Sequence, residues 1–329
     1  MLSSIEICAG AGGQALGLER AGFDHALVAE IDAAAASTLR ANRPSWDVRT
    51  LDVRGLSGRD FRGVDLFAGG VPCPPFSIAG KQLGSDDERD LFPTALRLVE
   101  ESRPRAVLLE NVPGLASARF ADYRRNLCVR LSSMGYEVHM QVLNASHFGV
   151  PQLRPRFVLV ALRPVASRRF RWPSPTGAAV FVGPTIGDLM ASNGWRGATR
   201  WVQRAAGIAP TLVGGSKKHG GPDLGPTRSR LAWLGLGVDG RGVADAAPAS
   251  EFAIDGNPRL TVRMGARIQG FPDIWRFVGK KTASWRQVGN AFPPPVAQAV
   301  GVQIMNAVLG LADVLEPEQT ALELTLVAV

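Results

Sequence analysis

The sequence predicts an α/β protein with a doubly wound, mostly parallel sheet and a smaller, loop-rich second domain. Over residues 1–165, short apolar runs alternate with segments of helical spacing, which is typical of parallel strands joined by helices. Beyond about residue 165 the chain is rich in Gly and Pro, and it includes Trp172, Trp195, Trp201 and Trp233. A linker would not hold so many large apolar side chains, so we predict a folded domain there.

The predicted elements follow one another along the chain. Strands are expected at residues 4–8, 26–29, 64–67, 106–109 and 156–162. Helical spacing of apolar side chains is found at residues 13–21, 33–42, 90–102 and 294–310. We therefore expect the larger domain to comprise residues 1–183, completed by 278–329, and the smaller domain to comprise 184–277.

Composition narrows the class of protein. No membrane span is predicted because no run of about 18 uncharged apolar residues occurs, and the N-terminus does not resemble a signal peptide. The three cysteines are irregularly spaced, which suits a reducing cytoplasm. Residues 160–250 hold 12 Lys or Arg against 4 Asp or Glu, a surplus equal to the net charge of +8. This surplus favours a surface that binds a polyanion, although a solvated basic face would have the same composition.

A glycine-rich turn follows the first predicted strand and opens the first predicted helix. It reads Cys8-Ala9-Gly10-Ala11-Gly12-Gly13, and its glycines let a ligand approach the backbone and the free N–H groups of the helix start. Glu30 ends the next strand, where a carboxylate can hold two ribose hydroxyls. Asp52 ends a third strand-like run and can accept a hydrogen bond from an adenine amine. These positions predict a cofactor that contains adenosine, although an ordinary glycine turn would look similar.

Cys73 follows the strand at residues 64–68, at the sheet edge where ligands bind in open α/β folds. It lies in the segment Gly69-Gly70-Val71-Pro72-Cys73-Pro74-Pro75, whose prolines exclude regular structure. We interpret Cys73 as a catalytic nucleophile. The alternative is a buried structural cysteine.

Two further motifs place polar side chains beside predicted strands. Glu110 directly follows four apolar residues, so partial desolvation would favour its protonated form and proton donation to a ring nitrogen. A capping or salt-bridged surface Glu is the alternative. Arg154 and Arg156 lie on an extended segment before a predicted strand, and we expect one of them to face a pocket while the other supports the loop. Two solvated arginines are the commoner arrangement for such a pair.

In this order, the motifs resemble those of the DNA (cytosine-5)-methyltransferase family of bacterial restriction-modification systems. The resemblance covers residues 3–163 and 258–305. Its first motif contains the glycine turn and spans residues 6–13, from Glu6 to Gly13, and its second is Pro72-Cys73. The others are Glu110-Asn111-Val112, Gln152-Leu153-Arg154-Pro155-Arg156, residues 259–272 and Gln287-Val288-Gly289-Asn290-Ala291-Phe292-Pro293-Pro294.

The resemblance implies a Rossmann-like methyltransferase fold and methyl transfer from S-adenosylmethionine to C5 of cytosine in a short duplex DNA sequence. It implies a covalent bond from Cys73 to C6 of a flipped-out base, with catalytic support from Glu110, Arg154 and Arg156. It assigns the cofactor to residues 8–13 together with Glu30, Ile31, Asp52, Val53, Pro72, Asn290 and Ala291.

The segment 184–277 lies where the family carries its target-recognition domain. We expect DNA contacts from a loop closing over the base, at Ser77, Lys81, Gln82 and Arg89, and from Thr211, Lys217, Lys218, His219, Arg228 and Arg230 in the smaller domain. Solvated loop charge is the alternative for each of them. A restriction endonuclease acting on the same site is a candidate partner. We expect a monomer in the bacterial cytoplasm, associated with the nucleoid, and no metal.

Three positions depart from the family pattern. Cys8 stands where Phe is usual, Pro74 follows the catalytic Cys where Gln is more common, and Met264-Gly265 replaces Glu-Ala. None of these changes removes a group that the chemistry requires.

Three alternatives stay open. A tRNA methyltransferase of the same superfamily would share the catalytic motifs, although the long segment before the late motifs argues against it. A nicotinamide-dependent oxidoreductase would share only the glycine turn. A catalytically inactive DNA-binding module would not need Cys73, Glu110 and Arg156 intact.

Overall fold

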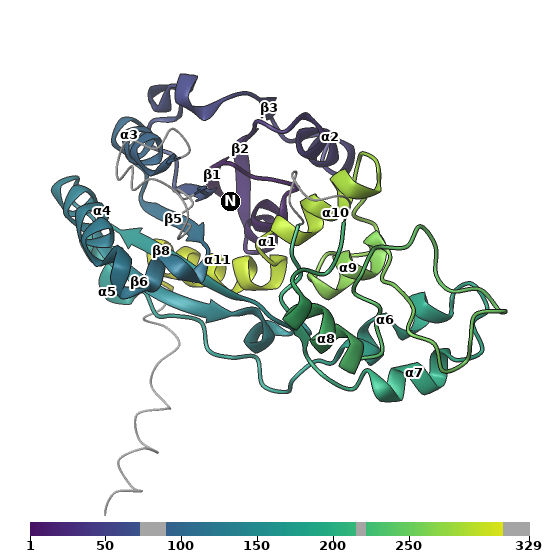
Figure 1. The fold of residues 1–329 in the computed structure, drawn as a ribbon. Helices are drawn as coiled ribbons and strands as arrows, with labels where there is room; N and C mark the ends of the chain where they lie inside the picture. Colours follow the sequence, from purple (N-terminus) through teal and green to yellow (C-terminus); the bar gives the residue numbers. More distant parts are fainter. Residues whose placement is uncertain (73–89, 215–221, 312–329) are drawn as a thin grey trace, which may run out of the picture.

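The computed structural model describes residues 1–72, 90–214 and 222–311. Its larger part is built on a seven-stranded sheet with the order β3-β2-β1-β4-β5-β8-β6 (Figure 1). Strands β1 to β5 pair in parallel, whereas β8 pairs antiparallel with β5 and β6. The strands are β1 (Leu2–Ile7), β2 (Phe23–Glu30), β3 (Val48–Thr50), β4 (Leu66–Gly70), β5 (Ala106–Asn111), β6 (Glu137–Asn144) and β8 (Pro155–Leu162). The predicted α/β class with a mostly parallel sheet is confirmed.

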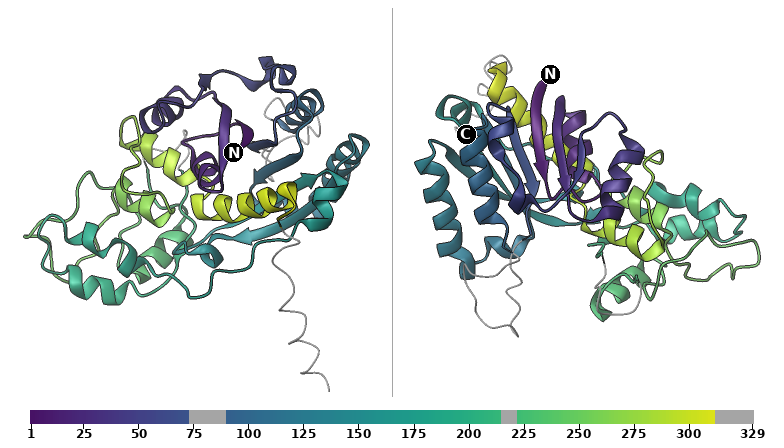
Figure 2. Two further views of the ribbon diagram at one scale, coloured as in Figure 1. Left: turned by 180° about the vertical axis from the view of Figure 1, so that it is seen from behind. Right: turned by 90° about the horizontal axis from the view of Figure 1, so that it is seen from above.

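Helices cover both faces of this sheet. One face carries α1 (Gly13–Arg20), α2 (Ala33–Asn42), α5 (Pro164–Arg169) and α11 (Pro294–Leu309), and α11 crosses it in full view in Figure 2. The other face carries α3 (Phe92–Ser102) and α4 (Ala121–Ser133). All six residues of β5 are buried, as expected for a central strand covered on both sides.

The smaller part has a core of its own. It contains α6 (Val182–Ala191), α7 (Ala198–Arg204), α8 (Thr227–Gly235) and α9 (Val262–Ile268). Trp195, Trp201 and Trp233 are buried together in this core. Trp172 instead packs against the apolar cluster of the sheet, beside Phe170.

A short parallel ladder and a helix join the two parts. β7 (Gln152–Leu153) pairs with β9 (Ala209–Pro210). Helix α10 (Lys281–Asn290) contributes Trp285 to the core of the smaller part, and the Trp285 indole N–H donates to the Val213 carbonyl at 3.0 Å. The carboxyl ends of the parallel strands therefore face the first residues of the smaller part. None of the helices in the described ranges has the length and apolar composition needed to cross a membrane.

Candidate active site

The glycine-rich turn folds back sharply between β1 and α1. Cys8, Gly10 and Gly12 have φ angles of 52°, 56° and 85°, in the left-handed region that favours glycine. A Cβ on Gly10 would meet no other protein atom within 4 Å. This face of the turn is therefore open to the cavity that Gly10 lines.

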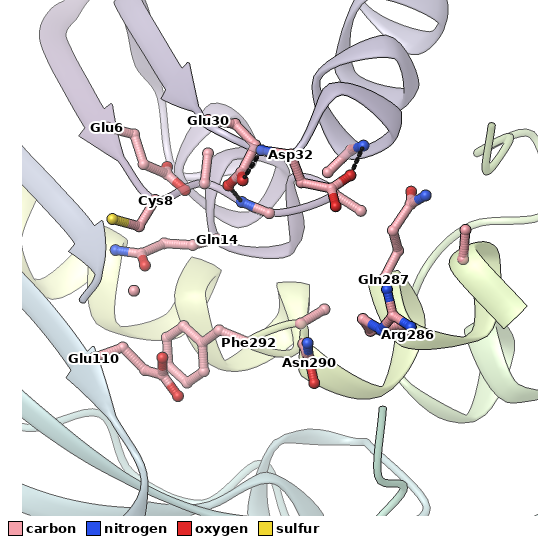
Figure 3. A pocket seen from close by; sticks show the side chains of 17 residues that line it. Glu6, Cys8, Gln14, Glu30, Asp32, Glu110, Arg286, Gln287, Asn290 and Phe292 are labelled. Carbon is pink, nitrogen blue, oxygen red and sulfur yellow. Dashed lines mark hydrogen bonds between the residues drawn. The ribbon is translucent and has the colours of Figure 1, made fainter. Parts of the chain in front are cut away.

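A cavity of about 250 Å³ lies at the carboxyl ends of the central parallel strands (Figure 3). Its size is close to the lower end of the range for small-molecule sites, roughly 300–1,000 Å³. We call it the acidic cavity, because four carboxyl side chains line it: Glu6, Glu30, Asp32 and Glu110. Helix α10 and the residues after it close the opposite side.

The Glu30 carboxylate ties the glycine turn to the end of β2. It accepts hydrogen bonds from the Gly10 N–H and from the Asp32 N–H, both at 2.7 Å. Each carboxylate oxygen keeps a second lone pair for another donor. Ile31 is 66% exposed, so an apolar side chain is freely presented next to this carboxylate.

Asp52 lies outside the lining of the acidic cavity. It is exposed and caps the short helix Val53–Gly55, where it accepts from the Arg54 N–H and pairs with the Arg54 guanidinium, each at 2.9 Å. The backbone N–H bond and the guanidinium together lower the pKa of Asp52. Among the described residues that line the acidic cavity, neither Asp52 nor the buried Val53 is found.

Glu110 and Arg156 form a buried ion pair at the other end of the cavity. Arg156 Nε lies 2.8 Å from Glu110 Oε1, and the two side chains are 11% and 12% exposed. Burial raises the pKa of Glu110, while Arg156 and Arg154 oppose this effect. A Cβ on Gly70 would approach Glu110 Oε2 to 3.4 Å, so the glycine leaves room around the carboxyl group.

Asn111 fixes the start of the segment that carries the predicted nucleophile. Its buried side-chain amide donates to the Val71 carbonyl at 2.7 Å. Pro72 is the last residue described before the gap. Cys73 lies outside the described residues, as do Ser77, Lys81, Gln82 and Arg89.

Arg154 is enclosed by protein oxygens, whereas Arg156 is the member of the pair that meets Glu110. Arg154 Nη1 donates to the Leu212 carbonyl at 2.6 Å, and Arg154 Nη2 donates to the carbonyls of Gly289 and Ala291 at 2.6 and 3.0 Å. Its side chain is completely buried. Arg154 thus joins β8, the start of the smaller part and the end of α10.

Several residues of the cavity were given no role in the sequence analysis, although Glu6 and Phe292 lie within its motifs. Within the described ranges, the buried side-chain polar atoms of Glu6 and Gln14 have no hydrogen-bond partner. Burial raises the pKa of Glu6 well above its ordinary value, which favours the neutral carboxyl group. Arg286 and Phe292 also line the cavity. A charged residue inside the apolar run of β1 was the available signal for Glu6.

The residues predicted to contact DNA are dispersed. The Thr211 hydroxyl donates to the Leu153 carbonyl at 2.7 Å, so it helps to hold the ladder between β7 and β9. Arg228 is exposed on α8, and Arg230 is half-buried two residues further along the same helix. Lys217, Lys218 and His219 lie outside the part of the chain that the structure describes.

Comparisons with known proteins agree with this geometry. The family model described as C-5 cytosine-specific DNA methylase matches residues 2–225 and 237–306. The Type II methyltransferase M.NaeI of Lentzea aerocolonigenes is 58% identical over 93% of this chain and 75% of its own length. M.NgoMIV of Neisseria gonorrhoeae, also a Type II methyltransferase, is 52% identical over 93% of this chain and 97% of its own.

Solved structures share the fold at low sequence identity. A protein from an E. coli prophage, described as a DNA modification methyltransferase, superposes with a TM-score of 0.66 at 23% identity, covering 94% of this chain and 100% of that one. A DNMT2 variant from Spodoptera frugiperda gives 0.66 at 16% identity, with coverage of 94% and 100%. The family match confirms the resemblance drawn from the motifs, does not favour the tRNA alternative, and is incompatible with an oxidoreductase. The chain therefore belongs to the C-5 cytosine-specific DNA methylase family and is a DNA cytosine-5 methyltransferase.

Proposed function

We propose that the enzyme uses S-adenosylmethionine to methylate C5 of one cytosine in a short duplex DNA sequence, as part of a restriction-modification system. The buried ion pair of Glu110 and Arg156, 2.8 Å apart, is the observation that carries the proposal, because Glu110 lines the same cavity as the glycine turn. The relatives M.NaeI and M.NgoMIV are named Type II methyltransferases. A restriction endonuclease with the same recognition sequence is the candidate partner, and the enzyme is expected to act as a monomer.

The residues of the acidic cavity fit the proposed cofactor. The open face of Gly10 gives a ligand access to the backbone, and the free lone pairs of Glu30 suit the ribose hydroxyls. The partnerless polar atoms of Glu6 and Gln14 lie beside the turn, where a polar ligand would offset their desolvation. When bound, S-adenosylmethionine supplies an electrophilic methyl group. The other proposed contacts are Ile31, Asn290 and Ala291.

Asp52 is proposed to meet the adenine amine only in competition with Arg54, because that guanidinium already occupies its carboxylate. Arg154 is proposed to position the site rather than to touch the substrate. Its four donor contacts are all to protein oxygens, and they hold the segment of Asn290 and Ala291 in place.

Methylation at C5 requires activation of the cytosine ring. The thiolate of Cys73 adds to C6, while Glu110 donates a proton to N3, so the electron pair of the C5–C6 double bond makes C5 nucleophilic. Arg156 donates a hydrogen bond to O2 of the base. After methylation, a base removes the C5 proton, the C5–C6 double bond re-forms, and the C6–S bond breaks to regenerate the Cys73 thiolate. N3 returns its proton to the Glu110 carboxylate, which restores the acid.

The target cytosine must leave the duplex before this chemistry can occur. Flipping a base costs a few kcal/mol, and phosphate contacts made by basic side chains can offset that cost. The surplus of Lys and Arg in residues 160–250 is proposed to provide those contacts.

The test is methylation of unmethylated plasmid DNA by the purified protein with S-adenosylmethionine, read by bisulfite sequencing. We expect 5-methylcytosine confined to one short motif, and none with Cys73→Ala. A Cys73→Ala variant that keeps more than about a tenth of the wild-type rate would remove Cys73 from the mechanism. Methylation of tRNA in place of duplex DNA would overturn the proposed substrate.

A further inference from the structure

Arg286 brings a positive charge to the wall of the acidic cavity. It lies on α10, four residues before Asn290, and both side chains line the cavity (Figure 3). Residues four apart share one face of a helix. The helix therefore presents a guanidinium and an amide to the same space.

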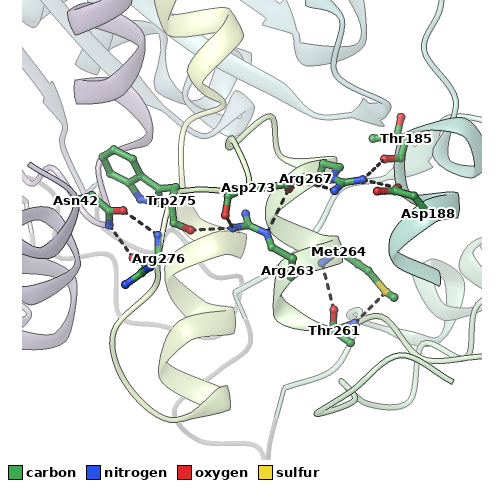
Figure 4. A network of polar contacts seen from close by, with 10 residues as sticks. All are labelled: Asn42, Thr185, Asp188, Thr261, Arg263, Met264, Arg267, Asp273, Trp275 and Arg276. Carbon is green, nitrogen blue, oxygen red and sulfur yellow. Dashed lines mark hydrogen bonds and ion pairs between the residues drawn. The ribbon is translucent and has the colours of Figure 1, made fainter. Parts of the chain in front are cut away.

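The guanidinium of Arg286 has no protein partner within the described ranges, and its Nε is buried without a hydrogen bond. The arginines on the adjacent α9 differ in having protein partners (Figure 4). Arg263 leaves its Nε and Nη2 without a hydrogen bond, but its Nη1 donates to the carbonyls of Asp273 and Trp275 at 2.9 and 2.8 Å, and Arg267 pairs with Asp273. Leaving a partly buried charge unpaired is unfavourable. An anionic ligand group next to Arg286 would offset this cost.

The charges of the cavity match those of the proposed cofactor. Among the described residues that line it, Arg286 is the one Lys or Arg, whereas four carboxyl side chains and the Cys8 thiol are the other ionisable groups. S-Adenosylmethionine carries a sulfonium and an ammonium, which suit an acidic wall, and a single carboxylate, which does not. The carboxylate therefore has one favourable place in the cavity, beside a guanidinium that can bind it through two parallel hydrogen bonds.

We propose that Arg286 binds the carboxylate of the methionine part of S-adenosylmethionine. The inference rests on the proposed cofactor and adds a residue that none of the sequence motifs had singled out.

The test compares two ligands by isothermal titration calorimetry. S-Adenosylhomocysteine keeps the carboxylate, and decarboxylated S-adenosylhomocysteine keeps the amine and the adenosine but lacks it. Arg286→Gln should weaken binding of the first by about 10- to 100-fold, since charged hydrogen bonds are worth about 1.5–3 kcal/mol. It should change binding of the second by less than about twofold. Arg286→Lys should fall between wild type and Arg286→Gln.

Lys280→Gln is the matched control. Lys280 is exposed at the start of the same helix, so its loss removes a charge without changing the cavity wall. Its affinities should stay within about twofold of wild type. Thermal melts of all variants check that the fold is retained.

Two outcomes would overturn the role proposed for Arg286 and leave the proposed cofactor in place. An equal loss for both ligands would show that Arg286 supports the cavity without recognising the carboxylate. Unchanged affinity for S-adenosylhomocysteine together with weaker DNA binding would assign the guanidinium to a phosphate. A folded wild-type protein that binds neither ligand would instead overturn the proposed cofactor and the inference with it.

Discussion

Cys8 lines the acidic cavity, yet its thiol is unsuited to nucleophilic attack. Burial, followed by the nearby carboxylates of Glu30 and Asp52, raises its pKa to about 12. Almost no thiolate is present near neutral pH at such a value. We expect Cys8→Ala to keep its methylation rate within about threefold of wild type, and mass spectrometry after iodoacetamide treatment to find Cys8 unmodified.

Cys73→Ala provides the contrast, because it should lose turnover while still binding S-adenosylhomocysteine. A folded Cys8→Ala variant that binds the cofactor product normally but does not methylate DNA would refute this division of roles. The comparison separates the cysteine that shapes the cavity from the one proposed to attack the base.

Glu110 should set the alkaline limb of the pH–rate profile. Its pKa is raised by burial, and the proposed role requires the protonated form, so the rate should fall as pH rises through that pKa. Glu110→Gln keeps an N–H donor but has no proton to give. We expect a loss of about 10²–10⁴-fold in the single-turnover rate and no alkaline fall. If Glu110→Gln keeps the same fall of rate at alkaline pH, the titration of another group must cause that fall.

The sequence predicted the site residues at strand ends but not those that long-range packing brings to the cavity. Glu110 and the glycine turn stand at strand ends, where topology alone brings them to one edge of the sheet. Arg286 faces the cavity only because α10 packs between α2 and the smaller part, through contacts such as Gln287 to Thr38 at 2.6 Å. Such long-range packing has no signature in local sequence. Glu6 lies within the first motif but was assigned no role, because the strand around it was interpreted only as apolar core.

At the scale of elements, β8, the ladder of β7 and β9, and the end of α10 meet at Arg154. A lysine ammonium cannot reach the carbonyls of Leu212, Gly289 and Ala291 together, so Arg154→Lys leaves buried acceptors unpaired. We expect a loss of about 3 kcal/mol in the free energy of unfolding. Urea denaturation followed by tryptophan fluorescence measures it.

Arg163→Lys is the matched control for this prediction. Arg163 follows the end of β8 and is half-buried; it donates to the Met134 carbonyl at 2.7 Å and to the Tyr136 hydroxyl at 3.0 Å. Its replacement should cost about 1 kcal/mol. Equal losses for the two variants would show that Arg154 has no special role in joining the segments.

The elements that the sequence did not predict are those with little buried surface. Strand β6 lies at the edge of the sheet, and most of its residues are exposed or half-buried, so it lacks an apolar run. Helix α4 buries only Leu127 and Leu131 of its 13 residues. The central strands were predictable because burial on both faces demands continuous apolar sequence, as in β5.

At the scale of the whole molecule, charge is distributed unevenly along the chain. The acidic cavity lies at the sheet, whereas the surplus of Lys and Arg lies in residues 160–250. This division suits an enzyme that binds a cationic cofactor group in its interior and a polyanion on its surface. If DNA binds to this basic surface, its affinity must fall as the salt concentration rises, because binding releases counterions from the phosphates.

Arg228 is the described side chain best placed to test this dependence, since it is exposed on α8, within the basic segment. Each phosphate contact contributes about −0.9 to the slope of log K against log salt concentration for duplex DNA. We expect Arg228→Ala to reduce the magnitude of the slope by about 1, measured by fluorescence anisotropy. Arg62→Ala should leave it unchanged, because Arg62 is exposed before the start of β4, at the edge opposite the carboxyl ends of the parallel strands. Equal slopes for the two variants would mean that Arg228 does not contact a phosphate and that the surplus of Lys and Arg acts only through net charge.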